Sequence, residues 1–257
     1  MGIVNATPDS FSDGGMHAAA AAAIEHGLRL RAEGADILDI GGESTRPGAT
    51  PVALAEELDR VLPVVAGLRD CGVALSIDSM KPEVMAAALA AGADMLNDVN
   101  ALRAPGALEI AAASDCGVCL MHMRGTPQTM QIAPEYDDVV GEVEAFLLER
   151  LTAAHRAGIA MERLTLDPGF GFGKTTAQNL ALFRALARFS AHAPVLIGVS
   201  RKSLFGKLID RRTPDRLVGS VTAAVIAARR GAAIVRVHDV AATVDALKVW
   251  RALDGED

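Results

Sequence analysis

The sequence has few aromatic residues: they make up only 4% of its 257 positions, whereas 51% of the residues are hydrophobic. A single Trp, a single Tyr and seven Phe argue against a core of stacked rings. They favour a core of Ala, Val, Ile and Leu, which suits helices layered around strands. Uncharged stretches such as residues 217–228 reach about a dozen residues, fewer than the roughly 18 expected for a membrane span.

Basic clusters are also lacking, and the formal net charge is −7. We therefore expect neither nucleic acid nor an anionic membrane as a partner. No basic segment precedes an apolar run at the start, so no signal peptide is predicted. The odd number of cysteines, three, argues against a disulfide framework and favours a reducing cytoplasm. Cys116 and Cys119 form a CxxC without a second pair, and we interpret them as buried small residues rather than a metal or redox site.

Eight short apolar runs alternate with segments rich in Ala and Leu. The runs cover residues 3–4, 37–40, 73–77, 95–96, 118–121, 164–166, 195–199 and 234–237. The segments of helical character cover 18–33, 53–69, 82–91, 106–114, 139–157, 179–189, 216–230 and 241–253. This alternation predicts parallel strands joined by helical crossovers, in either a closed barrel or an open doubly wound sheet. No linker or composition break divides residues 1–257, so we expect one α/β domain.

Polar residues follow every apolar run. They are Asn5, Asp39 with residues 43–46, Asp78, Asn97 with Asp98, His122, Asp167, residues 200–202, and Arg236 with His238. One Asp after a strand is often only a helix cap. Polar groups at all eight ends instead predict a site at the carboxyl end of a barrel.

Three loops are rich in Gly and Pro, at residues 5–15, 41–48 and 167–174, and we interpret them as binding loops. The third, DPGFGFGK, is similar to a phosphate-binding P-loop. It has Pro168 where that pattern needs Gly, so no nucleoside triphosphate site is expected.

The carboxylates and the amide of Asp78, Asn97 and Asp167 suit a heterocycle with a donor-rich amidine edge, such as a pterin. The two carboxylates could alternatively be a general acid and base, or metal ligands. No HxH or HExxH pattern accompanies them, which argues against a transition-metal centre.

Arg236 and His238 lie two residues apart and are expected to point the same way from one strand. With Asn5, Thr45 and Arg46 in neighbouring loops, they predict a pyrophosphate site, where Mg²⁺ would share the charge. The alternative for Arg236 is a buried ion pair with a barrel carboxylate.

Lys202 lies near the end of the seventh run, and it could be a point charge, a hydrogen-bond donor or a Schiff-base amine. The adjacent Arg201 would help keep the amine protonated if both side chains faced the site.

Seven segments together resemble the dihydropteroate synthase family across nearly the whole chain. They are NATPDSFSDGG, GGESTRPGA, SIDSMKPEV, NDVN, LDPGFGFGKT, GVSRKSLFG and VRVHDV. The resemblance implies a TIM (β/α)8 barrel, usually a homodimer. It also implies a transferase of folate biosynthesis and a sulfonamide target, which condenses 6-hydroxymethyl-7,8-dihydropterin pyrophosphate with p-aminobenzoate.

The resemblance also implies roles for individual residues. Asp78, Asn97 and Asp167 would hold the pterin, and Thr45, Arg236 and His238 would bind the pyrophosphate. Phe11, Phe172 and Ser203 would lie near the aminobenzoate, and Asn5 would contact Mg²⁺. Lys202 would donate to the pterin and, with Arg236 and His238, would be catalytic. The chain has Ala6 where the family usually has a larger aliphatic residue, which affects the expected packing of the first loop.

Three other functions compete with this interpretation. A pterin-binding methyltransferase barrel would share the carboxylates but lack the pyrophosphate loops. An aldolase would use Lys202 as a Schiff base. A non-catalytic pterin-binding subunit would keep only the pocket.

Overall fold

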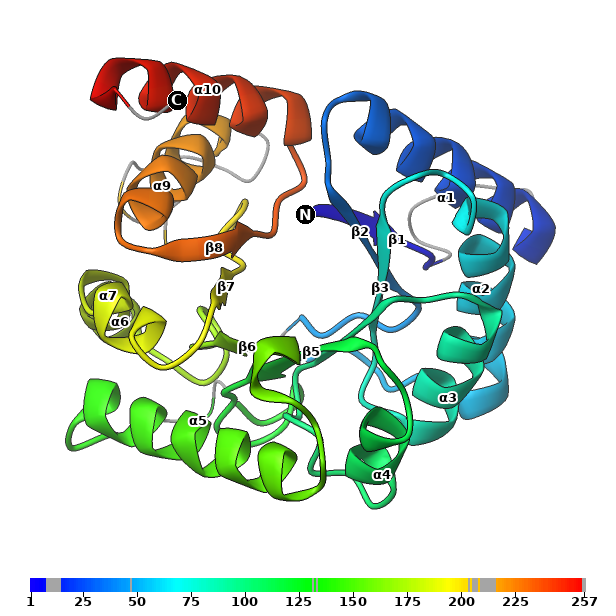
Figure 1. The fold of residues 1–257 in the computed structure, drawn as a ribbon, viewed down its shortest axis with the longest axis horizontal. Helices are drawn as coiled ribbons and strands as arrows, with labels where there is room; N and C mark the ends of the chain where they lie inside the picture. The colour runs from blue at the N-terminus through cyan, green and yellow to red at the C-terminus, as the bar shows by residue number, and fades with distance from the viewer. Residues whose placement is uncertain are drawn as a thin grey trace.

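The computed structural model describes residues 1–7, 15–46, 48–130, 132, 134–202, 204, 208 and 216–255. The predicted strands form one parallel sheet, in which each strand pairs with the next along the chain (Figure 1). They are β1 (Gly2–Asn5), β2 (Ile37–Gly41), β3 (Ala74–Asp78), β4 (Met95–Asp98), β5 (Gly117–Met121), β6 (Leu164–Asp167), β7 (Val195–Ile197) and β8 (Ala232–Val235).

The sheet closes on itself just after β8. Gly2 of β1 pairs in parallel with Val237. The backbone N–H of Ile3 donates to the carbonyl of Val237 at 3.1 Å, and the N–H of Val237 donates to the carbonyl of Met1 at 3.0 Å. The fold is therefore a closed (β/α)8 barrel, and the open doubly wound alternative is excluded.

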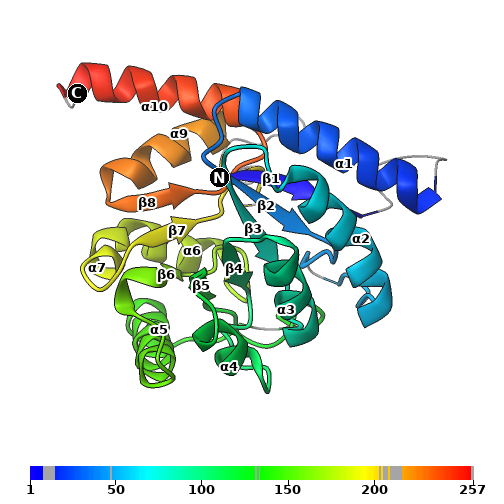
Figure 2. The ribbon, with the colours of Figure 1, turned by 45° about the vertical axis from the view of Figure 1, so that its right-hand side comes forward.

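Helices surround the strands (Figures 1 and 2). They are α1 (Gly15–Ala32), α2 (Leu54–Leu68), α3 (Pro82–Ala91), α4 (Ala107–Ala112), α5 (Val139–Arg156), α6 (Thr176–Arg184), α7 (Leu186–Ser190), α9 (Leu217–Arg229) and α10 (Val240–Asp254). The segment 179–189, expected as one helix, is divided at Ala185, whose φ of −93° and ψ of 9° end α6 and precede α7. Among the described residues, no helix combines the length and apolar character required to cross a bilayer.

The main core lies between the strands and the helices. Ile40 and Ile77 point outward from their strands and are fully buried in the same apolar cluster as Val65 and Leu68 of α2. Successive strand residues point to opposite sides, so the residues between these point into the barrel. This packing explains why strands buried on both faces appear in the sequence as short continuous apolar runs.

A second apolar cluster contains Met95, Cys119 and Leu196, with Ile37 and Ile234 packed against it. These residues alternate with the outward-facing ones along their strands, and they fill the part of the barrel below the polar strand ends. Cys119 is a buried free thiol here. Its surroundings agree with the interpretation of the CxxC as buried small residues.

Candidate functional site

The carboxyl ends of the strands bring three buried polar side chains together. Asp78 pairs in register with Gly41 on one side and with Asn97 on the other. Asp167 lies at the end of β6, and all three polar side chains belong to residues no more than 9% exposed. The three side chains lie at the carboxyl end of the barrel, above the apolar cluster that contains Cys119, as expected for a site formed by parallel strands.

Arg236 binds two carboxylates at this end of the barrel. Its Nε lies 2.5 Å from Asp39 Oδ2, and its Nη2 lies 2.7 Å from Asp78 Oδ2. Asn97 donates from Nδ2 to the same Asp39 oxygen at 3.1 Å. The ion-pair alternative for Arg236 is therefore present in the structure. The sequence analysis names Asp39 among the polar residues at the strand ends but assigns it no role in the site, and the structure adds that Asp39 pairs with Arg236.

Two carboxylate oxygens in this network have no hydrogen-bond donor among the described residues. Within the described part of the chain, Oδ1 of Asp39 and Oδ1 of Asp78 are buried and accept no hydrogen bond. A buried acceptor without a donor costs about 1–3 kcal/mol. A bound heterocycle with N–H donors would satisfy both atoms.

Burial changes the proton affinity of the two strand-end carboxylates. It raises the pKa of Asp78 to about 7, against the opposing effect of Arg236. It raises the pKa of Asp167 to about 6, although the Gly169 N–H donates to Asp167 Oδ1 at 2.7 Å. Both groups can therefore exchange a proton near neutral pH.

Lys202 and Phe172 lie beside the carboxylates. The Lys202 ammonium lies 4.5 Å from the centre of the Phe172 ring, within the range of a cation–π contact. Burial and the nearby Arg236 lower the pKa of Lys202 to about 8. Arg201 does not face this amine, because its guanidinium pairs with Asp239, with Nη2 at 2.5 Å from Oδ1.

The end of β8 differs from the sequence prediction in one respect. The strand ends at Val235, so Arg236 lies after the strand rather than inside it. Val237, which pairs with β1, separates Arg236 from His238 and is buried. Arg236 and His238 thus share one side of an extended segment, as the two-residue spacing predicted.

His238 is held in place by Ser200. Its Nδ1 lies 3.1 Å from Ser200 Oγ, and its backbone N–H donates to the same oxygen at 3.2 Å. Burial, followed by the charges of Arg201 and Arg236, lowers the pKa of His238 to about 4. The imidazole is therefore neutral at pH 7, and it can donate one hydrogen bond.

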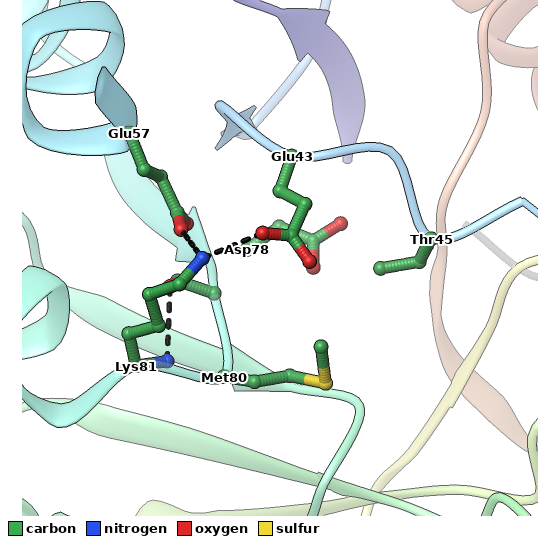
Figure 3. Close-up of a pocket in the computed structure, with 7 residues that line it drawn as sticks. Glu43, Thr45, Glu57, Asp78, Met80 and Lys81 are labelled. Carbon is green, nitrogen blue, oxygen red and sulfur yellow. Dashed lines mark hydrogen bonds and ion pairs between the residues drawn. The ribbon is translucent and has the colours of Figure 1, made fainter. Parts of the chain in front are cut away.

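The loop between β2 and α2 carries Thr45 and Arg46. Thr45 is half-buried and lines a hollow together with Asp78 and Met80, whereas Arg46 is exposed (Figure 3). Asn5 is exposed at the end of β1. Phe11 and Ser203 lie outside the described residues.

Two lysines near the site were not singled out from the sequence. Lys81 donates to Glu43 Oε2 at 2.5 Å and also to Glu57, and the three side chains line the hollow beside Thr45 (Figure 3). Lys174 is only 3% exposed, and its Nζ lies 2.9 Å from His122 Nδ1.

Lys174 also donates to three backbone carbonyls, those of Gly169 at 2.8 Å, Phe172 at 2.9 Å and His122 at 3.3 Å. The loop packs so closely that a Cβ on Gly169 would lie 1.8 Å from the His122 carbonyl oxygen. The Lys174 amine is thus turned into the protein, which agrees with the expectation that this loop is not a P-loop.

The metal prediction rests on Asn5 alone. Among the described residues, no group of three or more His, Cys, Asp or Glu side chains could hold a metal ion. The exposed amide oxygen of Asn5 fits an ion such as Mg²⁺, which keeps several waters and takes further ligands from a bound phosphate.

A family model described as pterin binding enzyme matches residues 1–238. The chain is 50% identical over 254 residues to the dihydropteroate synthase of Escherichia coli strain K12, with 98% of this chain and 90% of that protein covered. It is similar to the structure of Xanthomonas albilineans dihydropteroate synthase with 4-aminobenzoic acid, with a TM-score of 0.94, 58% identity, and 99% and 92% of the two chains covered. It is also similar to the Yersinia pestis dihydropteroate synthase structure with a sulfonamide drug complex, with a TM-score of 0.94, 48% identity, and 99% and 94% covered.

Proposed function

The chain belongs to the pterin-binding enzyme family, and we propose that it catalyses the dihydropteroate synthase reaction. This transferase reaction of folate biosynthesis joins 6-hydroxymethyl-7,8-dihydropterin pyrophosphate to p-aminobenzoate and releases pyrophosphate. The observation that carries the proposal is the pair of buried, unpartnered oxygens on Asp39 and Asp78, held beside Arg236 at the barrel mouth. They provide acceptors for the pterin next to a cation for its leaving group.

The pterin end of the site consists of Asp78, Asn97 and Asp167. Their carboxylates and amide accept hydrogen bonds from the amino and ring N–H groups of the pterin. Burial of Asp78 and Asp167 excludes water, so these hydrogen bonds compete with little solvent. Lys202, whose ammonium lies 4.5 Å from the centre of the Phe172 ring, would donate a hydrogen bond to the pterin ring.

The reaction breaks the C–O bond at the pterin methylene, and the electron pair leaves with the pyrophosphate. The aminobenzoate nitrogen then forms the new C–N bond, and its proton passes to solvent or to the departing pyrophosphate. The electron-rich ring stabilises the cationic methylene, so stabilisation of the leaving group should dominate catalysis. Arg236 and the neutral imidazole of His238 provide donors for that purpose, together with Thr45 and Arg46.

Arg236 is shared between the two ends of the site, because it binds Asp78 while serving the pyrophosphate end. A guanidinium with five N–H donors can hold two carboxylate oxygens and still donate to a phosphate. The ion pair with Asp39 and Asp78 therefore orients Arg236 rather than excluding it from catalysis.

By the resemblance, Phe172, Phe11 and Ser203 would lie near the aminobenzoate, and the Lys202 ammonium lies 4.5 Å from the centre of the Phe172 ring. The Xanthomonas albilineans relative was solved with 4-aminobenzoic acid, and the Yersinia pestis relative in a sulfonamide drug complex. By similarity with these relatives, we propose that this chain also binds both kinds of ligand and is a sulfonamide target.

We further propose Mg²⁺ as a cofactor, with Asn5 as a ligand. When bound, the ion would share the negative charge of the pyrophosphate. Because the protein would contribute few ligands, affinity for the ion should depend strongly on bound pyrophosphate.

A homodimer in the cytoplasm is proposed for two separate reasons. The exposed fractions of Val218, Val249 and Leu253, on α9 and α10, are 73%, 58% and 81%, and these apolar side chains favour contact with a second copy. The three cysteines are free thiols, as is usual in a reducing compartment. Light scattering in solution would measure the oligomeric state.

Pyrophosphate release with both substrates tests the proposed reaction. We expect release that requires p-aminobenzoate and yields 7,8-dihydropteroate. A pterin-binding methyltransferase or a non-catalytic subunit would give no such release. Borohydride trapping of Lys202 with a carbonyl substrate would instead indicate the aldolase.

A further inference from the structure

A charge cluster of Glu43, Glu57 and Lys81 joins three segments beside the hollow that contains Thr45 (Figure 3). Glu43 lies in the loop after β2, Glu57 in the first turn of α2, and Lys81 just before α3. The Lys81 ammonium donates to both carboxylates, and its Nζ lies 2.5 Å from Glu43 Oε2. One lysine therefore connects the β2–α2 loop to the segment that follows Asp78.

Glu57 is an unusual residue for its position. It is 1% exposed, and it belongs to the buried face of α2 with Val61, Val64 and Leu68, where an apolar residue would be expected. Its Oε1 accepts no hydrogen bond within the described residues. Burying a carboxylate in this way is unfavourable unless it is paired, so its place in the fold points to a role in holding Lys81.

Glu43 fixes the base of the loop. Its Oε2, which accepts from Lys81, also accepts from the backbone N–H of Val52 at 3.0 Å. The adjoining Gly42 packs so tightly on α2 that an added Cβ would lie 2.6 Å from Val61 Cγ1. Arg60 of α2 donates to the Gly42 carbonyl at 2.8 Å. The two ends of the loop are thus attached to α2 and to Lys81, while Thr45 and Arg46 lie between them.

Lys81 stays charged in this cluster. Burial lowers its pKa, but the hydrogen bonds with Glu43 and Glu57 raise it further, so the net shift is upward. The ammonium also offsets two carboxylates beside a loop that is expected to approach an anion. Without it, their negative charge would oppose binding of the pyrophosphate.

We propose that Lys81 is a positioning residue that acts through Glu43 to hold Thr45 and Arg46 in place for the pyrophosphate. The inference rests on the proposed function, because it assigns the β2–α2 loop to the leaving group of the synthase reaction. It predicts a defect that depends on the phosphates of the substrate and not on its pterin ring.

Glu43→Gln gives the direct test, because it preserves shape and leaves the buried Lys81–Glu57 pair intact. We expect kcat/KM for the pterin pyrophosphate to fall roughly 10- to 100-fold, as for a misplaced binding group. Calorimetry with 6-hydroxymethyl-7,8-dihydropterin, which lacks the phosphates, should give an unchanged affinity. Unchanged kcat/KM, or an equal loss of affinity for the pterin without phosphates, would overturn the proposal.

Lys81→Met and Lys81→Arg form a second pair. The methionine should reproduce the defect of Glu43→Gln, and the arginine should restore most of the activity because it keeps the charge. A matched control is Glu149→Gln on α5, where the side chain is 65% exposed and, among the described residues, pairs only with its neighbour Arg150 at 3.4 Å. If Lys81→Met does not fold, Glu43→Gln alone decides the outcome.

The wild-type protein separates this proposal from the proposed function. Wild-type protein without aminobenzoate-dependent pyrophosphate release would contradict the synthase assignment itself. An active wild type with unaffected Glu43→Gln and Lys81→Met variants would contradict only the role of Lys81.

Discussion

Replacing Lys174 with methionine should change how the stability of the barrel depends on pH. The Lys174 amine is enclosed by His122 and by three backbone carbonyls, and the residue is 3% exposed. Burial lowers the pKa of Lys174 from 10.5 to about 7. In the unfolded chain the amine is fully solvated, so its ordinary pKa returns.

The sign of the effect follows from proton binding in the two states. Between about pH 7 and pH 10.5, the unfolded chain binds a proton at Lys174 that the folded chain does not. Stability therefore rises with pH in this window, by up to about 1.4 kcal/mol per pH unit. Between pH 7 and 8.5, the Lys174 contribution amounts to roughly 1.5 to 2 kcal/mol. Below pH 7 Lys174 is protonated in both states, and the depressed pKa lowers the free energy of unfolding by its full amount.

Urea denaturation at several values between pH 7 and 8.5 would measure the free energy of unfolding of the wild type and of Lys174→Met. The difference between the two proteins isolates Lys174, because other titrating groups contribute to both. Lys248→Met, which removes an exposed lysine from α10, serves as the control and should keep the wild-type rise. Parallel curves for the wild type and Lys174→Met would refute the reasoning, because the carbonyls would then be keeping the ammonium charged throughout.

Three further predictions concern the same end of the barrel. Gly169→Ala should destabilise the protein by about 2 to 3 kcal/mol, because φ at this position is +72° and the added Cβ would lie 1.8 Å from the His122 carbonyl oxygen. Thermal or urea unfolding would measure the loss, and a variant of wild-type stability would contradict this packing. Asp167→Asn should weaken binding of the pterin more than binding of p-aminobenzoate, and calorimetry that finds equal losses would oppose a pterin role. His238→Ala and Arg236→Ala should each lower kcat by about 10²- to 10³-fold. Normal steady-state rates in both variants would exclude them as stabilisers of the leaving group.

The strands and the location of the site were predictable from local features. Each buried strand appears as an apolar run, and each run is followed by a polar residue at the end where a barrel forms its site. The glycines after four helical segments are an equally local signal. Gly34, Gly92, Gly158 and Gly231 all have positive φ, which glycine adopts without strain.

Features that depend on contacts distant in sequence were not predictable. Closure of the barrel depends on Val237 pairing with Gly2, and no pattern within either segment encodes that pairing. The division between α6 and α7 at Ala185 also has no breaker residue to announce it. The direction of Lys174 is a third case, because the same sequence could have presented the amine to a phosphate.

The pairing of Arg236 shows how one such contact changes the interpretation of the site. The chemistry of the residue types and the resemblance assign Asp78 to the pterin and Arg236 to the pyrophosphate, as separate ends. The structure brings them to 2.7 Å, with Asp39 on the other side of the guanidinium. The proposed pterin and pyrophosphate ends are therefore coupled through one side chain, and a substitution at Asp78 should also disturb Arg236.

This coupling also explains how an acidic protein can accept an anionic substrate. The chain carries a formal net charge of −7, yet at the site Arg236 and Lys202 offset the buried carboxylates. Burial raises the pKa of Asp78 to about 7, so the negative charge of this carboxylate beside Arg236 is reduced at neutral pH. Local placement of a few cations, rather than net charge, therefore makes the barrel mouth compatible with pyrophosphate.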